Sequence, residues 1–225
     1  MRLWKIIMSF NLIDINNWAR KDYYIHYMHE LRCTYSLTAN INITGVRTAV
    51  KSMNKKIYPA QIYMLTTIVN RYQEFRMNID TNGNLGYWDE LNPSYTIFNK
   101  DKETFSSIWT MYSTSFMQFY ESCISDIAYY SSATNLIPKP NEPLNTFNIS
   151  CLPWVSFTGF NLNVYTDGCY LPPIFTIGKF IEQDEEVLMP LAIQVHHSVC
   201  DGFHVGRFIN ALQEWADNYD EWLYR

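Results

Sequence analysis

The stretch Val195-His196-His197-Ser198-Val199-Cys200-Asp201-Gly202 decides how the C-terminal part of this chain folds. A strand-like apolar run, 188–195, leads into it, and a helix-like run, 203–222, follows it. Imidazole is the side chain best suited to take a proton from a hydroxyl near neutral pH, because its unperturbed pKa lies near that pH. A histidine at a strand-to-helix corner is rigidly held and still reachable. The stretch therefore indicates a general base.

A structural interpretation of the same stretch stays open at this point. His197 and Asp201 would then form a polar cap between strand and helix, with Asp201 as the helix N-cap. The spacing His-x-x-x-Asp is short and common, and alone it favours the cap. The histidine before it, the glycine after it and the run Phe203-His204-Val205-Gly206 shift the balance to function.

The same residues resemble a known family. The spacing His197-x-x-x-Asp201-Gly202 is similar to the active-site signature of CoA-dependent acyltransferases, and residues 194–205 resemble the chloramphenicol acetyltransferases in particular. Further similar strings follow in order along nearly the whole chain: Asn17-Trp18-Ala19-Arg20, Tyr58-Pro59, Glu74-Phe75-Arg76-Met77, Glu103-Thr104-Phe105-Ser106, Asn148-Ile149-Ser150, Pro153-Trp154-Val155 and Phe160-Asn161-Leu162-Asn163-Val164. Their order and spacing together carry the resemblance.

Composition narrows the class of protein. A chain of 225 residues with 48% hydrophobic and 17% charged residues can bury a substantial core, so wholesale disorder is excluded. A net charge of −5 argues against nucleic acid as the main partner, because phosphate binding needs a basic face. No run approaches the roughly 20 apolar residues that span a bilayer, so we expect no membrane partner. The five scattered cysteines suit neither a disulfide framework nor a metal site. We expect a cytoplasmic protein that uses no metal or prosthetic group.

The chain is expected to form one domain, residues 1–225, because no repeat, charge block or Pro/Gly linker interrupts it. Residues 1–10 lead into a first strand. Apolar spacing predicts helices over 14–31, 44–53, 59–72, 203–222 and, as one or two helices, 105–130. A hairpin is expected from 76–79 and 85–88, and strands from 147–154, 160–165, 174–182 and 187–198, with a turn at 183–186. This irregular alternation indicates an α+β sandwich. The resemblance implies a two-layer α/β sandwich, a mixed sheet packed against helices, that assembles as a homotrimer with active sites between subunits.

Acetyl transfer from a thioester needs a base, a donor for the oxyanion and fixed reactants. The resemblance implies that His197 is the base for the primary hydroxyl of the antibiotic and returns the proton to the CoA sulfur. It also implies that Ser150 donates to the oxyanion and that Thr176 holds an ordered water. Asp201 is expected to pair with Arg20 and hold the active-site segment in shape, rather than to pair with the base.

His196 is assigned a structural role, because successive residues of a strand face opposite sides. The resemblance places seven residues at the acceptor: Tyr27, Leu31, Cys33, Tyr35, Phe105, Phe160 and Leu162. It places four at the acetyl-CoA co-substrate: Lys56, Tyr58, Trp154 and Lys179. Taken singly, these residues read as core or as solvated lysines. Ser94 stands where some relatives have a larger polar residue and Tyr35 where phenylalanine is frequent, so the polarity of the pocket and the range of substrates could differ.

The resemblance implies direct transfer of acetyl from acetyl-CoA to chloramphenicol in a ternary complex. No Gly-x-Ser-x-Gly elbow or thiol-enzyme signature points to an acyl-enzyme. Two alternatives stay open. One is an acyltransferase of the same fold acting on another alcohol or thiol, such as a dihydrolipoyl group, but the chain has no lipoyl domain or Ala/Pro-rich linker. The other is a non-catalytic drug-binding protein. Thiol release from acetyl-CoA with and without chloramphenicol separates these hypotheses.

Overall fold

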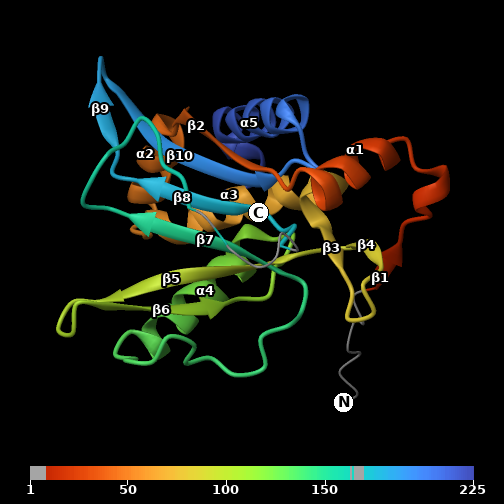
Figure 1. Cartoon of the computed structure of the whole chain (residues 1–225). Helices are drawn as coiled ribbons and strands as arrows, with labels where there is room; N and C mark the ends of the chain where they lie inside the picture. Colours follow the sequence, from red (N-terminus) through yellow and green to blue (C-terminus); the bar gives the residue numbers. More distant parts are fainter. Residues whose placement is uncertain (1–8, 163, 165–169) are drawn as a thin grey trace.

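A computed structural model describes residues 9–162, 164 and 170–225 of the chain. Its main feature is a mixed seven-stranded sheet (Figure 1). The strand order is β2-β10-β8-β7-β5-β6, and β9 pairs with β10 off this path. The strands are β2 (Thr34–Asn42), β5 (Asn92–Asn99), β6 (Thr104–Trp109), β7 (Thr146–Leu152), β8 (Ile174–Gly178), β9 (Ile181–Gln183) and β10 (Glu186–His196).

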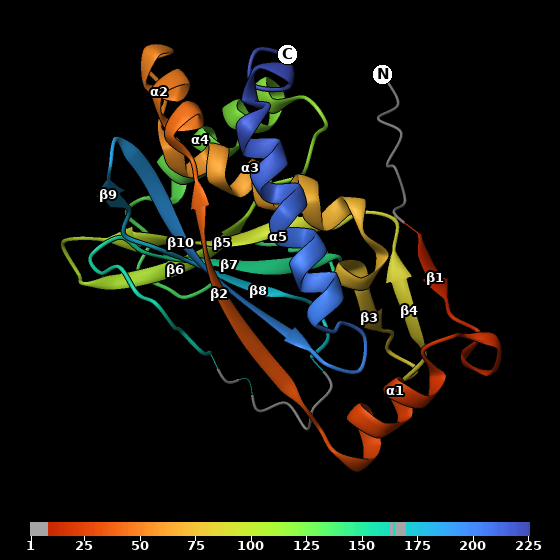
Figure 2. The ribbon, with the colours of Figure 1, turned by 90° about the horizontal axis from the view of Figure 1, so that it is seen from above.

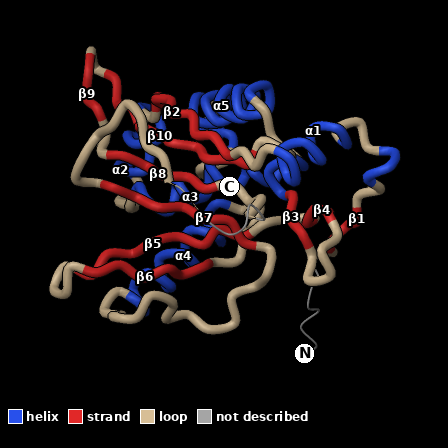
Figure 3. Tube along the Cα trace, viewed as in Figure 1, coloured by secondary structure: helices blue, strands red, loops and turns tan. Residues whose placement is uncertain are grey.

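Helices cover one face of this sheet, as Figures 2 and 3 show. They are α2 (Thr44–Ser52), α3 (Ile57–Arg71), α4 (Phe116–Tyr130) and α5 (Gly202–Asp217). Alternate residues of a strand face opposite sides, so Phe175 and Ile177 of β8 join the core while Thr176 between them faces away from it. The result is two layers with the core between them, and a second sheet face without helices.

Strand β10 positions the strand-to-helix corner. It pairs antiparallel with β2 over nine residues, ending at His196 opposite Thr34, and with β8 on its other side. Two neighbours and burial along most of its length hold the strand firmly. The residue after it, His197, is fixed by its backbone N–H, which donates to the carbonyl oxygen of Cys33 at 2.8 Å.

A second, antiparallel sheet has the order β1-β4-β3. It consists of β1 (Phe10–Leu12), β3 (Met77–Ile79) and β4 (Leu85–Trp88), and the hairpin predicted from 76–79 and 85–88 is confirmed. The Asp80 carboxylate accepts from the backbone N–H groups of Asn82 and Asn84, and Gly83 has a φ of 83°. This turn conformation favours glycine, which explains the sharp reversal.

The prediction of helix over 105–130 is wrong in its first part. Residues 104–109 form β6, which pairs with β5, and the helix α4 begins only at Phe116. The alternation of buried Ser106 and Ile108 with more open neighbours is the two-residue period of a strand. Aromatic residues without breakers do not distinguish the two structures. The strands β2 and β5 were not singled out by the sequence pattern either.

Three other expected elements differ from the structure. The expected helix over 14–31 is broken into a 3-10 turn at Ile15–Asn17, α1 (Lys21–Ile25) and a π-helical turn at His26–Glu30. The strand expected over 174–182 is two strands, β8 and β9, which both pair with β10 and are interrupted at residues 179–180. Residues 160–162 form no strand, and residues 163 and 165 lie outside the described part of the chain, as does most of the leader 1–10.

The remaining expected elements are confirmed with shifted ends. Residues 183–186 turn between β9 and β10, with positive φ angles at Asp184 and Glu185. The last helix, α5, is followed by a 3-10 turn at Tyr219–Glu221. Within the described part of the chain, no helix combines the length and the apolar character needed to cross a bilayer.

Candidate active site

His197 lies in an aromatic setting at the end of β10. Its imidazole stacks on the ring of Tyr27, with centroids 4.1 Å apart and planes 6° apart, and the ring of Tyr35 meets it edge-on at 5.2 Å. Tyr27 is presented by the π-helical turn His26–Glu30, and such turns are frequent at functional sites. Among the described residues, His197 Nδ1 is buried without a hydrogen-bond partner. Nε2 is therefore the ring nitrogen that remains open.

The pair predicted between Arg20 and Asp201 is present. Arg20 Nη1 lies 2.7 Å from Asp201 Oδ2, and both side chains are largely buried. The other carboxylate oxygen, Oδ1, accepts from the backbone N–H of Phe203 and so caps α5. The cap and the ion pair, which the sequence left as alternatives, thus coexist on the two oxygens of one carboxylate.

The charges around Asp201 favour its ionised form. Partial burial acts to raise the pKa of this carboxyl, but the hydrogen bond from Arg20 and the nearby charges of His204 and Arg20 outweigh it. The net result is a pKa below the ordinary value. The carboxylate is therefore ionised at neutral pH, and it joins the start of α5 to Arg20, the residue before α1.

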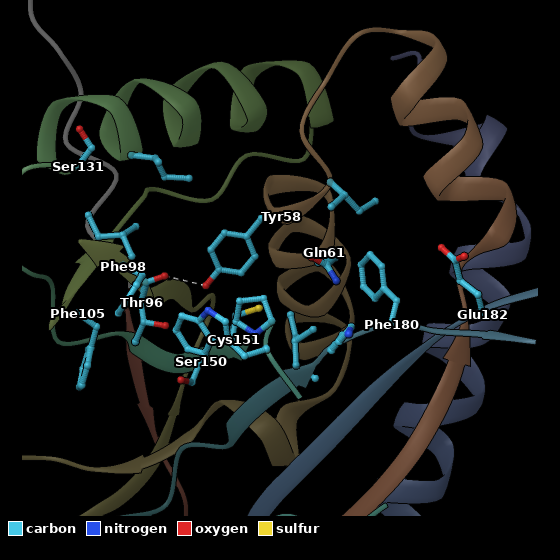
Figure 4. A pocket seen from close by; sticks show the side chains of 18 residues that line it. Tyr58, Gln61, Thr96, Phe98, Phe105, Ser131, Ser150, Cys151, Phe180 and Glu182 are labelled. Carbon is cyan, nitrogen blue, oxygen red and sulfur yellow. Dashed lines mark hydrogen bonds between the residues drawn. The ribbon is translucent and has the colours of Figure 1, made fainter. Parts of the chain in front are cut away.

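A cavity of about 880 Å³ is lined by residues of α3, α4, β5, β7 and β8 and by the residues that follow β7. Three of the four residues predicted at acetyl-CoA, Tyr58, Trp154 and Lys179, line it together with Ser150 and with Phe105, which was predicted at the acceptor. Figure 4 shows the hydroxyl of Tyr58 bonded to the carbonyl oxygen of Thr96, at 3.0 Å. The lining is mostly apolar, with polar atoms at a few points, which is typical of sites for small molecules.

Burial suppresses ionisation inside this cavity. It raises the pKa of the Tyr58 hydroxyl well above its ordinary value and that of the Cys151 thiol to about 11. Both groups are therefore neutral at pH 7. Lys179, at the rim, is the cation among the lining residues, so a negatively charged ligand group would meet its charge there.

Thr176 does not line this cavity. It lines a separate recess on the sheet face that carries no helices. Phe160, Leu162, Ser36 and Gln194 are among the other residues that line this recess. Ser150 and Thr176 are direct register partners on β7 and β8. The two side chains therefore project from neighbouring positions of the sheet.

The remaining predicted site residues, Leu31, Cys33, Lys56 and His196, do not line the cavity. Leu31 is exposed at the end of the π-helical turn, and Cys33 is half-buried beside His197. Lys56 is exposed and its side chain is not among those that line the cavity, although its backbone N–H donates to the Tyr120 hydroxyl. His196 is buried, with Nδ1 at 2.7 Å from the Ser198 hydroxyl.

Sequence reasoning missed several residues of the cavity. Gln61, Thr96, Phe98, Cys151 and Phe180 also line it. Only Cys151 carried a signal, because it follows Ser150 directly. The others come from α3, β5 and the β8–β9 turn, which no local pattern connects.

Ser150 and His197 lie far apart within one chain. Ser150 on β7 pairs with Thr176 on β8, and Thr176 in turn pairs with Ala192 on β10. His197 lies five residues after Ala192. Strand spacings of about 4.8 Å and 3.3 Å per residue put the Cα atoms of Ser150 and His197 roughly 19 Å apart. A group of a few atoms bound at one of these side chains therefore cannot touch the other side chain of the same chain.

No group of three or more His, Cys, Asp or Glu residues is placed to hold a metal ion within the described ranges. The site is thus built from an imidazole, an ion pair, hydroxyl groups and an apolar cavity.

Known proteins match this chain along nearly its full length. The family model described as chloramphenicol acetyltransferase matches residues 8–213. A chloramphenicol acetyltransferase of Clostridium perfringens is 56% identical over 216 residues, which cover 96% of this chain and 99% of that protein. A chloramphenicol acetyltransferase of Bacillus pumilus is 51% identical, covering 95% and 96%.

Solved structures share the fold. A chloramphenicol acetyltransferase structure superposes with a TM-score of 0.86 at 23% identity, covering 92% of this chain and all of that one. The dihydrolipoamide acetyltransferase of Azotobacter vinelandii superposes with a TM-score of 0.67 at 17% identity, covering 84% of each chain. At these identities the superpositions establish the architecture alone.

Proposed function

Because the chain belongs to the chloramphenicol acetyltransferase family, we propose that it transfers the acetyl group of acetyl-CoA to the primary hydroxyl of chloramphenicol and so inactivates the antibiotic. The observation that carries this proposal is the match to the Clostridium perfringens relative over nearly the whole of both chains. The protein is an acyltransferase. It acts in the cytoplasm, where acetyl-CoA is available.

His197 is the general base. The Tyr27 ring stacked on its imidazole and the buried Nδ1 leave Nε2 to face the acceptor hydroxyl. As the hydroxyl oxygen attacks the thioester carbonyl carbon, Nε2 takes the hydroxyl proton. The C–S bond then breaks, and the proton passes to the CoA sulfur to give free thiol and acetyl ester. No acyl-enzyme is formed.

Ser150 donates a hydrogen bond to the oxyanion of the tetrahedral intermediate, and Thr176 beside it holds a water. The register pairing of Ser150 with Thr176 supports this proposal, because paired residues of neighbouring strands project from the same face of a sheet. A fixed donor aimed at developing charge lowers the barrier more than it strengthens ground-state binding.

The cavity beside Ser150 holds acetyl-CoA. Its apolar wall suits the pantetheine arm, Tyr58 and Trp154 offer ring faces and edges, and Lys179 meets phosphate charge at the rim. Lys56 lies at the start of α3 next to the lining residue Ile57, where it reaches the same anionic groups from outside. The acceptor lies against Tyr27, Leu31, Cys33 and Tyr35 on one side.

A second copy of the chain completes the site. Since Ser150 and His197 of one chain are roughly 19 Å apart, the acetyl group must lie between the His197 end of one subunit and the Ser150 side of its neighbour. The sheet face without helices supplies the contact, and Phe105, Phe160 and Leu162 then meet the acceptor from the neighbouring subunit. A ring of three such contacts closes as a homotrimer.

The activity is tested by drug-dependent release of CoA. Purified protein with acetyl-CoA is monitored with a thiol reagent, with and without chloramphenicol, and the product is identified by mass. We expect thiol release only with the drug and one acetyl group per drug molecule. Drug binding without release would favour a sequestering protein, and release with a dihydrolipoyl acceptor alone would favour the other acyltransferase.

The shared site is tested by complementation. His197→Ala and Ser150→Ala chains carrying different tags are co-expressed, and trimers that contain both are purified through the two tags. In every mixed ring one of the three junctions combines an intact His197 with an intact Ser150, so about a third of wild-type activity should return. Activity no higher than that of the single variants would place both residues in the same chain's site.

A further inference from the structure

The corner after β10 is connected to residues that the proposed mechanism does not use. His204, in the first turn of α5, and Glu74, in the 3-10 turn Gln73–Arg76, lie in a line with Asp201 and Arg20. His204 Nδ1 is 2.8 Å from Asp201 Oδ1, and His204 Nε2 is 3.4 Å from Glu74 Oε1. Both belong to strings singled out above, Glu74-Phe75-Arg76-Met77 and Phe203-His204-Val205-Gly206.

His204 holds Asp201 in either of its protonation states. The backbone N–H of Asp201 lies 3.1 Å from the same Nδ1 that approaches the carboxylate. A ring nitrogen donates to a carboxylate only with its proton and accepts from an N–H only without it. Each state therefore keeps one bond to Asp201, while Nε2 faces Glu74 in both.

The middle of this chain of contacts is shielded from most of the solvent. The side chains of His204 and Glu74 are 13% and 17% exposed. Arg207 also contacts Glu74, and its guanidinium lies over the ring of Tyr72 at 4.4 Å. The groups that face His204 are thus two carboxylates, each already paired with one arginine. Low exposure strengthens such interactions and makes the loss of one partner costly.

We propose that His204 and Glu74 are positioning residues for the acetyl transfer: the Glu74–His204 pair fixes the Asp201 carboxylate against Arg20 and thereby sets the direction of the His197 imidazole. The inference rests on the proposed function of this site. Asp201 lies four residues after His197, and the intervening turn is anchored at Cys200, whose N–H donates to the carbonyl oxygen of His196 at 3.1 Å. A small rotation of Asp201 is therefore transmitted to the base.

A helix cap alone would explain part of this geometry, and His204→Gln separates the two roles. Glutamine at the third position of a helix is an ordinary partner in a capping box, so it can accept from the Asp201 N–H. It does not reproduce the rigid imidazole bridge to Glu74. Glu74→Gln removes the charge at the other end of the bridge without touching the cap.

We expect His204→Gln to keep the Tm within a few degrees of wild type and to lower kcat about tenfold, with both KM values within about twofold. Glu74→Gln should lower kcat to a similar degree, and the double variant should be no worse than either one, because a single bridge is broken. Asn210→Ala, an exposed change on the same helix, is the matched control and should leave kcat unchanged.

The outcomes separate this inference from the proposed function. Wild-type protein that shows no drug-dependent CoA release overturns the function itself. Active wild-type protein together with a folded His204→Gln variant of unchanged kcat overturns the positioning role and leaves His204 a helix cap. A loss of kcat in Arg207→Gln that equals the loss in Glu74→Gln, with His204→Gln unaffected, would assign the role of Glu74 to the arginine instead.

Discussion

The two ends of the sheet differ in how their side chains are held. At the His197 end, stacking on Tyr27 and a backbone hydrogen bond to Cys33 hold a half-buried imidazole, and the Arg20–Asp201 ion pair lies four residues further along. At the Ser150 end, a cavity of about 880 Å³ is lined mainly by apolar side chains. In the proposed function, the first end holds the proton acceptor in place and the second end admits a long, flexible ligand.

This difference shows how a binding site and a reacting group are combined. Precise placement matters most for groups that touch the reacting atoms, because misplacement by about 1 Å can cost 100-fold in rate. A cofactor tunnel tolerates more variation, because many weak apolar contacts share the binding energy. We therefore expect substitutions at the rigid end to change kcat, and substitutions at the cavity wall, apart from Ser150, to change the KM for acetyl-CoA.

The largest effect is expected from His197→Ala. Loss of the base should lower kcat by about 10⁴-fold, while the trimer and drug binding persist because the ring is only half-buried and packs against Tyr27 and Tyr35. Steady-state kinetics and chloramphenicol binding by calorimetry would measure this. Near-native turnover by a folded variant would remove His197 from the chemistry.

The Ser150→Ala change tests the cavity end of the sheet. It should lower kcat by about 10²–10³-fold and leave the KM for both substrates nearly constant, because the oxyanion exists only after attack. Cys151→Ala, the adjacent lining residue, is the matched control, and it should leave kcat close to wild type. A loss confined to the KM for chloramphenicol would make Ser150 a binding residue.

The ion pair at the rigid end should behave as one unit. Arg20→Ala and Asp201→Asn should each lower kcat by about tenfold, and the double variant should be little worse than either single one. The coupling free energy expected for two groups in contact is about 0.5–3 kcal/mol. A double-mutant cycle on kcat and on unfolding measures it. Additive effects would mean that the 2.7 Å contact does not stabilise the corner.

The sequence was most informative where function and fold depend on neighbouring residues. Residues 195–202 predicted the strand, the corner and the helix together, because β10 and α5 meet there. The Arg20–Asp201 pair, 181 residues apart, followed from the family resemblance and not from periodicity. β6 was mistaken for helix because its strand character depends on pairing with β5. Gln61 and Phe180 were missed because the cavity brings together elements that no local pattern links.

The smallest predicted effect concerns stability against pH at Asp201. Its pKa in the folded protein lies below the ordinary value, because the bond from Arg20 and the neighbouring cations outweigh the effect of burial. A lowered pKa stabilises the folded state above the pKa of the unfolded chain, about 3.9, and this contribution is lost as the pH falls through the folded pKa. Asp201→Asn should therefore lower the Tm by about 2–8 °C at pH 7, which corresponds to about 1–2 kcal/mol.

The test compares the two proteins by calorimetry from pH 7 down to pH 3, at equal subunit concentration, since association shifts the Tm. The gap between wild type and Asp201→Asn should be widest near neutral pH and shrink below about pH 4. Asp184→Asn, an exposed turn residue with a φ of 50°, is the control, because asparagine tolerates that backbone conformation. A gap of the same size at pH 3 and pH 7 would show that Asp201 stabilises the rigid end by its shape and its helix cap, and that its charge toward Arg20 contributes little.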